Sequence, residues 1–215
     1  MALARYVTAS CLHSLRWVAP LLIFVLAVVV TYAPGGTTVS TLAEGASWLF
    51  PITAWLTVAT LNDEDPSQAS ITSAAAGGID VARAAKLSVA AGAGITMTAV
   101  SLITAYAVDH ANFTTNDLVL GVAAHLLSVV AGVALGSLCA RPVVTRTAWA
   151  ALAIVAVTTV DLVVPYAPPM RVILNGLNRP NTAGRWETLG IGAVETFAMA
   201  VVLLGASTYV ARSRS

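Results

Sequence analysis

The chain has 215 residues, of which 58% are hydrophobic and only 10% are charged, and its mean hydropathy is +0.83. A soluble domain carries about 25% charged residues, so the composition excludes an ordinary soluble protein and predicts a polytopic membrane protein that contacts the lipid bilayer. The net charge of +1 argues against a nucleic-acid partner. Two cysteines, Cys11 and Cys139, are too few for a disulfide framework or a CxxC metal site.

Residues 2–16 have the pattern of an amphipathic helix. Leu3, Val7, Cys11 and Leu15 recur near helical spacing, with polar residues mostly elsewhere on the wheel. This predicts an interfacial helix on the inner membrane surface, leading into the first span at Trp17. An unstructured polar leader is the alternative, and a cleaved signal peptide is a further one, although the apolar run is longer than usual.

The apolar runs predict an all-α fold that forms one transmembrane domain over residues 1–215. A helix needs about 17–25 residues to cross the hydrocarbon core. Six runs approach this length: residues 17–33, 46–61, 87–108, 118–140, 147–164 and 189–210. The second run contains Pro51, which predicts a kink or a tilt. Small residues at 90–94 and 132–136 predict closely packed helices.

Positive charge predicts the orientation of these spans. If the N-terminus is cytoplasmic, six crossings return the C-terminus to the cytoplasm. Eight of the eleven Lys and Arg residues are then cytoplasmic: Arg5, Arg16, Arg83, Lys86, Arg141, Arg146, Arg212 and Arg214. The positive-inside rule therefore places both termini on the cytoplasmic side of the plasma (inner) membrane.

A polar insert of 25 residues, 62–86, separates the second and third spans and holds four of the ten acidic residues. Asp65-Pro66 is typical of a helix start, because proline suits the first helical position. A short helix is expected from Ser67 to Ala76, ended by Gly77-Gly78. The orientation makes this element cytoplasmic, so we expect it to bind a partner; a merely solubilising loop is the alternative.

The last outward loop, 165–188, has an apolar middle at 170–177 between prolines. Eight residues cannot span a bilayer, so a short re-entrant or interfacial segment before the last span is expected, with a solvated loop as the alternative. Asp161, Arg171 and Glu195 are candidate pathway or outer-gate residues, because carboxylates within spans are costly. A structural salt bridge explains the same residues, and His125 is expected to be a hydrogen-bonded packing residue.

Motifs for catalysis are missing from the sequence. It contains no HExxH, GxSxG, EF-hand or P-loop pattern, so no catalytic residue, metal ligand or cofactor is assigned to this chain, which is predicted not to be an enzyme.

The arrangement of these parts resembles the permease of a type-2 ABC exporter. An interfacial helix precedes six spans, the largest cytoplasmic loop follows the second span, and a short apolar segment precedes the sixth. In that family the first cytoplasmic loop carries a coupling helix that docks on the ATPase subunit. The resemblance places coupling at Asp63, Glu64, Asp65, Ser73, Gly77, Gly78, Arg83 and Lys86. The chain departs from the family where an acid–arginine pair and a proline are expected, with Gly77-Gly78 in the place of the proline.

The resemblance implies a pathway between two permease chains, identical or different, with separate ATPase subunits that bind ATP and Mg²⁺. The low charge of the spans suits a hydrophobic or amphipathic cargo. Two other classes stay open: a membrane scaffold or accessory subunit, and a proton-coupled secondary transporter that uses Asp161 or Glu195.

Overall fold

A computed structural model describes residues 2–33, 39–108, 110, 113–164, 170–179 and 181–213. Within these ranges the regular secondary structure is all helical and there is no strand, as the apolar runs predicted. The helices are α1 (Ala2–Ser14), α2 (Val18–Tyr32), α3 (Val39–Leu61), α4 (Pro66–Ala76), α5 (Ile79–Val108), α6 (Thr115–Cys139), α7 (Thr147–Val163), α8 (Met170–Leu177) and α9 (Thr182–Ser213).

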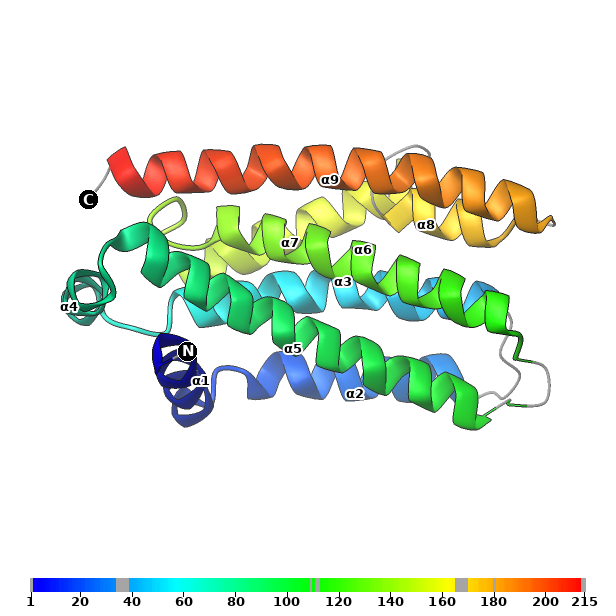
Figure 1. Cartoon of the computed structure of the whole chain (residues 1–215), viewed down its shortest axis with the longest axis horizontal. Helices are drawn as coiled ribbons and strands as arrows, with labels where there is room; N and C mark the ends of the chain where they lie inside the picture. Colours follow the sequence, from blue (N-terminus) through cyan, green and yellow to red (C-terminus); the bar gives the residue numbers. More distant parts are fainter. Residues whose placement is uncertain are drawn as a thin grey trace.

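The helices form an elongated bundle with two different ends (Figure 1). α2, α3, α5, α6 and α9 run along the long axis, whereas α1 and α4 lie across one end, near the last turns of α9. We call this the α4 end. The opposite end, which holds α8 and the first turns of α9, is the α8 end. The first and last described residues, Ala2 and Ser213, therefore both lie at the α4 end.

The expected N-terminal helix is present as α1, which meets α2 at an angle of 81°. The corner is made at Leu15, whose backbone has a φ of 54°. A non-glycine residue rarely adopts this left-handed conformation, so the turn is held by its surroundings. Trp17 follows the corner, and its indole Nε1 donates to the carbonyl of Leu12 at 3.2 Å.

α3 is the central helix and is buried along most of its length. It begins at Val39, seven residues before the expected start of the second span at residue 46, and it continues through Pro51 as one helix. Residues 34–45 are rich in Gly, Thr and Ser, a composition typical of a loop, but Leu42 and Ala43 are buried, and Leu42 packs in one cluster with Leu102 of α5. Tertiary packing therefore overrides the local preference.

α3 and α6 approach closely through two glycines of α6. A Cβ built on Gly132 would lie 2.6 Å from the Phe50 carbonyl oxygen, and one built on Gly136 would lie 2.6 Å from the Thr57 Cβ. Neither position has room for a methyl group, which confirms the tight packing predicted at 132–136. In the other small-residue run, Gly94 is similarly crowded by Val129, whereas Gly92 faces open space.

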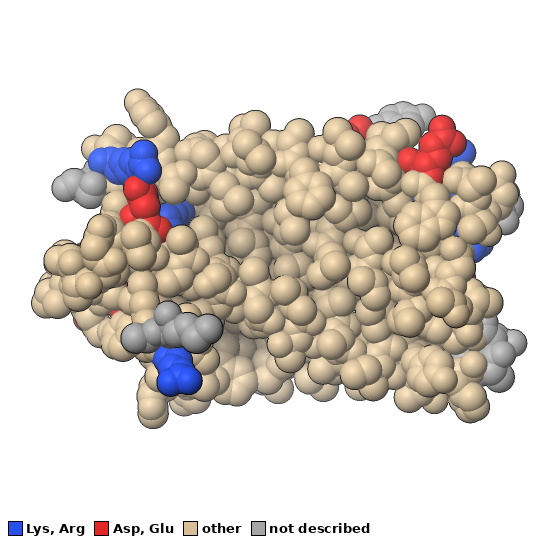
Figure 2. All heavy atoms as spheres, viewed as in Figure 1, with Lys and Arg blue, Asp and Glu red and all other residues tan. Residues whose placement is uncertain are grey.

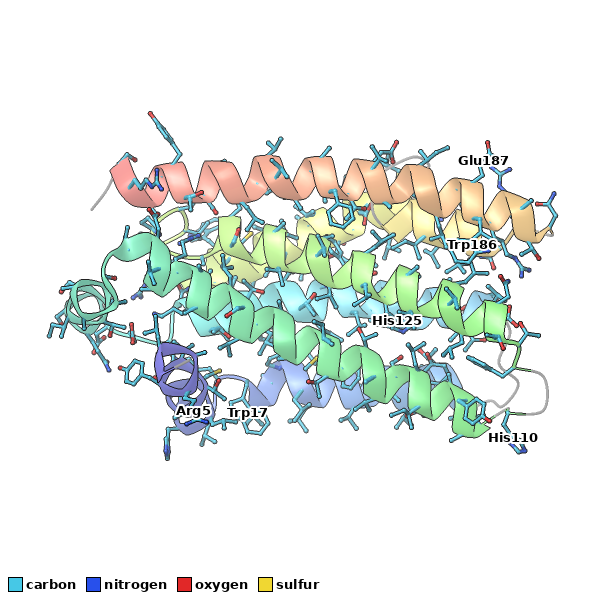
Figure 3. The ribbon with its side chains drawn as sticks, in the orientation of Figure 1. Arg5, Trp17, His110, His125, Trp186 and Glu187 are labelled. Atoms are coloured by element: carbon cyan, nitrogen blue, oxygen red, sulfur yellow. The ribbon has the colours of Figure 1, made fainter. Side chains whose placement is uncertain are left out.

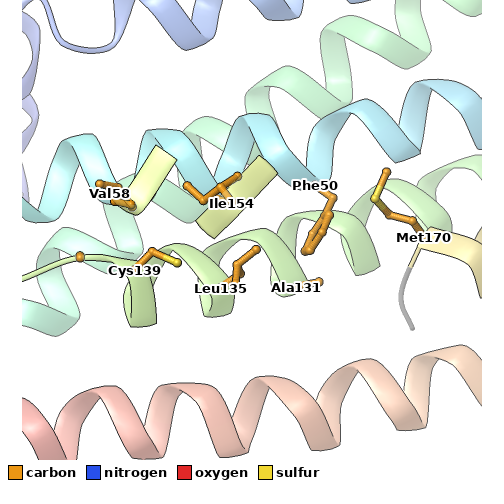
Figure 4. Close-up of a cluster of buried hydrophobic side chains, with 10 residues drawn as sticks. Phe50, Val58, Ala131, Leu135, Cys139, Ile154 and Met170 are labelled. Atoms are coloured by element: carbon orange, nitrogen blue, oxygen red, sulfur yellow. The ribbon is translucent and has the colours of Figure 1, made fainter. Parts of the chain in front are cut away.

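A buried apolar cluster joins α3 and α6 to α7 and α8 (Figure 4). Its labelled members are Phe50, Val58, Ala131, Leu135, Cys139, Ile154 and Met170. The buried threonine hydroxyls of α3 donate hydrogen bonds to backbone carbonyls one helical turn earlier, so they are not left unpaired. Thr53 donates to Leu49 at 2.6 Å, and Thr57 donates to Thr53 at 2.7 Å.

Three described helices are long and apolar enough to cross a membrane: α5, α6 and α9. The bent pair formed by α1 and α2 would make a fourth, and α7 is a shorter apolar helix. The six expected spans each fall on a helix, but only three or four satisfy this criterion, so six crossings stay a prediction.

Charged side chains on the visible face gather at the two ends, with an uncharged band between them (Figure 2). Trp17 lies toward the α4 end, and Trp186 toward the α8 end (Figure 3). Aromatic residues of this kind are enriched at membrane–water interfaces. Together with the apolar helices, this distribution is typical of a membrane protein.

Candidate functional site

The polar insert at 62–86 folds largely as its local sequence predicted. Asp65 has an extended backbone at the N-cap of α4, and Pro66 occupies the first helical position. Gly77 ends the helix with a φ of 88°, a left-handed conformation that favours glycine. Gly78 follows with a φ of 138°, and its amide donates to the Ser73 carbonyl at 2.9 Å.

α4 presents a small, uncharged surface at the end of the molecule. Ser67, Ile71, Ala74 and Ala75 share one side of the helix at a spacing of four, three and one residues, and all four are exposed. We call these four residues the α4 face. Ile71 is 70% exposed, which is high for a large apolar side chain.

A buried ion pair fixes the base of α4. The Lys86 ammonium lies 2.8 Å from Glu64 Oε2, and both residues are buried. The Thr72 hydroxyl donates to the other carboxylate oxygen of Glu64 at 3.0 Å. Glu64 therefore joins the segment after α3 to both α4 and α5.

The preceding residues tie this segment to α1 and to the loop after α6. The Ser10 hydroxyl donates to Asp63 Oδ2 at 2.5 Å, and the Arg16 guanidinium donates to the Asn62 carbonyl. The Asn62 side chain accepts from the Arg141 amide at 3.0 Å. Three parts of the chain that are distant in sequence thus meet at residues 62–64.

Arg83 is buried beside the C-terminal end of α6. Its guanidinium Nη2 donates to the Ser137 carbonyl at 2.8 Å, and Nη1 donates to the Arg141 carbonyl at 3.4 Å. Carbonyls at a helix C-terminus carry partial negative charge, which favours a cation there. The Nε of Arg83 is buried, and no hydrogen-bond partner for it is present in the part of the chain that the structure describes.

A cleft of about 840 Å³ lies between α4, the start of α5, the 141–145 loop and the last turns of α9. Its charged lining residues are Arg83, Lys86, Arg141, Glu64 and Asp65. Apolar side chains, among them Leu61 and Ile79, line the rest. The cleft is therefore amphipathic.

The structure divides the eight predicted coupling residues into two sets. Glu64, Arg83 and Lys86 are buried and bond within the chain, and Asp63 is half-buried. Asp65 and Gly77 are exposed, while Ser73 and Gly78 are half-buried. None of the four residues of the α4 face was among the predicted coupling residues. The sequence does offer one signal for this face, which is the apolar Ile71 within an otherwise polar insert.

The three predicted pathway residues do not form one site. Asp161 is buried, and its Oδ2 accepts from the Met170 amide at 3.0 Å, so it caps the N-terminus of α8. Arg171 is half-buried, and Glu195 is exposed on α9. No hydrogen bond or ion pair between their side chains is present in the described parts of the chain. The alternative explanation of Asp161 as part of a salt bridge is therefore not met among the described residues, where it caps α8 instead.

The expected short segment before the last span is present as α8, with the predicted bounds 170–177. Met170, Ile173 and Leu177 are buried, and the latter two pack in a cluster with residues of α3, α6 and α9. The prolines at 165, 168, 169 and 180, which framed this prediction, lie outside the described residues.

His125 is fully buried inside the bundle, in the half that lies toward the α8 end (Figure 3). Its Nδ1 is 2.7 Å from the Gly121 carbonyl, and its Nε2 is 3.0 Å from the Ser101 hydroxyl. A carbonyl only accepts, so Nδ1 donates and Nε2 accepts the Ser101 proton. Ser101 in turn lies 3.0 Å from the Tyr32 hydroxyl. This confirms His125 as a hydrogen-bonded packing residue that links α2, α5 and α6.

Among the described side chains, no group of three or more His, Cys, Asp and Glu residues could hold a metal ion. Comparison with protein-family models, curated proteins and solved structures gave no significant match. A function can therefore be inferred only from the fold and from the residues of the α4 end.

Proposed function

We propose that this chain is the permease subunit of an ATP-driven ABC exporter, and that α4 is the helix that binds a separate ATPase subunit. The observation that carries the proposal is the position of α4. It lies across the end of the bundle, exposes a small uncharged face, and has its base fixed by the buried Glu64–Lys86 pair. A rigidly mounted external helix suits the transmission of movement from a partner.

The distribution of basic residues supports a cytoplasmic α4 end. Seven Arg and Lys residues belong to this end: Arg5, Arg16, Arg83, Lys86, Arg141, Arg146 and Arg212. Three, Arg171, Arg179 and Arg185, belong to the α8 end. Under the positive-inside rule, α4 then faces the cytoplasm of a cell whose plasma membrane holds the bundle. Arg214 lies outside the described residues.

Within this proposal the predicted coupling residues take two roles. The exposed Asp65 and Gly77, together with the α4 face, contact the ATPase. Glu64, Arg83 and Lys86 hold α4 to α5 and α6, so that movement of α4 is passed to the helices. ATP and Mg²⁺ are bound by the partner.

An exposed carboxylate supports a second permease chain. Glu195 is exposed on α9 among apolar residues such as Val194, which is 71% exposed. It lies six residues inside the expected span 189–210, about 9 Å along the helix. A carboxylate facing hydrocarbon at this depth is costly, so a covering chain or an aqueous path is favoured. The low charge of the helices suits a hydrophobic or amphipathic cargo.

Co-purification tests the proposal. The tagged chain is extracted in mild detergent from its native membrane, and bound proteins are identified by mass spectrometry. Ile71→Arg places a charge on the α4 face, and Asn178→Arg places the same charge at an exposed site of the α8 end. We expect a P-loop ATPase with the wild type and with Asn178→Arg, and its loss with Ile71→Arg.

Two outcomes reject the exporter. If no P-loop ATPase accompanies the wild-type chain, the proposal fails. If Ile71→Arg instead releases a different cytoplasmic protein, the chain is a membrane scaffold or accessory subunit, which shares the same exposed α4 face. The proton-coupled alternative would use Glu195 or Asp161. One oxygen of Asp161, Oδ2, accepts from the Met170 amide, whereas the other, Oδ1, is buried and has no hydrogen-bond partner among the described residues.

A further inference from the structure

The buried guanidinium of Arg83 has no anionic partner among the described residues. Its relative exposure is 7%, its two described bonds go to neutral carbonyls, and its Nε has no hydrogen-bond partner. Two other basic residues at this end form ion pairs: Lys86 with Glu64, and Arg212 with Asp80. A buried charge is costly unless it is paired, so an anion beside Arg83 would be stabilising.

The cleft beside Arg83 has room and further positive charge for such an anion. Arg83, Lys86 and Arg141 line it against Glu64 and Asp65, so its formal charge is three minus two, or +1. The Glu64 carboxylate is already bonded to Lys86 and Thr72. The Arg141 side chain is exposed and has no ion pair with the described residues. Two guanidinium groups therefore remain to meet an anion.

The other lining residues, and the position of the cleft relative to the membrane, restrict the chemical class of the anion that it could bind. Leu61, Ile79, Ala82 and Ala211 give the cleft an apolar wall. The expected third span begins at residue 87, one residue after Lys86, which puts the basic residues at the level of lipid headgroups. Arginine suits phosphate because its fork of N–H donors matches the phosphate oxygens.

We propose that this cleft binds a phosphate group, carried either by an anionic phospholipid of the inner leaflet or by a soluble phosphate compound. Arg83 and Arg141 donate to the phosphate oxygens, and Ser70 and Ser73 of α4 supply further hydroxyl donors within the lining. The inference rests on the cleft and, for the phospholipid, on the orientation proposed above, and it holds whether or not α4 binds an ATPase.

Thermal unfolding of the purified full chain in neutral detergent tests this site. Cys11 and Cys139 are buried free thiols, so a thiol-reactive dye reports unfolding. Phosphatidylglycerol is titrated against phosphatidylcholine, and inorganic phosphate is titrated separately. A ligand that binds only the folded chain raises the midpoint in a concentration-dependent manner.

Three variants distinguish binding in the cleft from a general attraction of anions by the basic surface. Arg141→Gln removes a lining guanidinium, and Arg146→Gln removes an exposed guanidinium of the same end that does not line the cleft. Ser73→Trp fills the cleft without changing any charge. We expect about tenfold weaker binding for Arg141→Gln, the strength of one charge-assisted hydrogen bond, and no change for Arg146→Gln. Ser73→Trp should abolish binding. Arg83→Gln is less suitable, because Arg83 also holds the end of α6.

The ligand arms distinguish the two sources. If phosphatidylglycerol stabilises the chain and inorganic phosphate does not reduce this effect, the ligand is a lipid. If only inorganic phosphate stabilises the chain, the ligand is a soluble compound. Either result supports the site if it is lost with Ser73→Trp. The proposal is overturned if neither probe stabilises the wild type, if Arg141→Gln and Arg146→Gln weaken binding equally, or if Ser73→Trp binds as the wild type does.

Discussion

The close contact of α3 and α6 can be tested by adding a single methyl group at Gly136. The nearest atoms to a Cβ at this position are the Ala54 carbonyl oxygen and the Thr57 Cβ, which are backbone or attached directly to backbone. Neither can rotate away, so the two helices must separate. Gly92 provides a matched control, because a Cβ there meets nothing within 4 Å.

The magnitude follows from two opposing effects. Overpacking of a close contact costs about 1–3 kcal/mol, and the upper end applies where backbone must move. Replacing glycine by alanine within a helix returns about 1 kcal/mol. Gly136→Ala should therefore lower the free energy of unfolding by about 2 kcal/mol, while Gly92→Ala should raise it by about 1 kcal/mol.

Thiol reactivity provides the assay. Cys139 lies three residues after Gly136 and is 5% exposed, so its labelling reports on this contact as well as on global unfolding. A difference of about 3 kcal/mol between the two variants corresponds to midpoints separated by about 6–12 °C in a chain of this size. Equal midpoints for Gly136→Ala and Gly92→Ala would refute the close approach of α3 and α6.

Three further predictions concern polar contacts. Lys86→Met should lower the free energy of unfolding by about 3–5 kcal/mol, measured with denaturant, because it leaves the Glu64 carboxylate buried and unpaired. Adding Glu64→Gln should restore most of this loss, and no recovery in the double variant would contradict the pairing. Asp161→Ala should cost about 1 kcal/mol and speed amide exchange in α8, whereas Asp161→Asn should retain protection; unchanged exchange in the alanine variant would exclude the cap. The Arg212 guanidinium lowers the pKa of Asp80, so their pair stabilises the fold above the ordinary carboxyl pKa of about 4 and loses this contribution as the pH falls through the lower, folded value. The gap in thermal midpoint between wild type and Arg212→Gln should therefore close on acidification, and a gap that is constant with pH would contradict the pairing.

Local signals in the sequence predicted α4 well. Asp65-Pro66 and Gly77-Gly78 act through the backbone of the residues themselves: proline fits the first helical turn, and glycine adopts the left-handed conformation of Gly77. Such signals do not depend on distant parts of the chain, so the bounds of α4 could be predicted closely. The same holds for α8, whose apolar run matches the helix.

Contacts between residues distant in sequence determine the start of α3 and the partners of the buried charged side chains. Residues 39–45 have the composition of a loop, but they join α3 because Leu42 is buried against α5. Glu64 and Lys86 are 22 residues apart, and their pairing requires the hairpin formed by α4 and α5. Asp161 could have met several arginines of the 165–188 segment, and only the placement of α8 shows that it meets a backbone amide instead. These partners depend on tertiary structure that single-sequence patterns do not encode.

The junction at residues 62–64 also has a mechanical meaning. Its neighbours Ser10 and Arg16 belong to α1 and the corner after it, and its Glu64 carboxylate belongs to the base of α4. The two crosswise helices are consequently clamped to one short stretch of backbone and form a stiff cap on the bundle. A direct bond adds to this clamp, because Gln68 Nε2 of α4 donates to the Tyr6 hydroxyl of α1 at 3.2 Å. A force on α4 would therefore tilt α1 together with it, and a spectroscopic label on α1 would report binding at the α4 face.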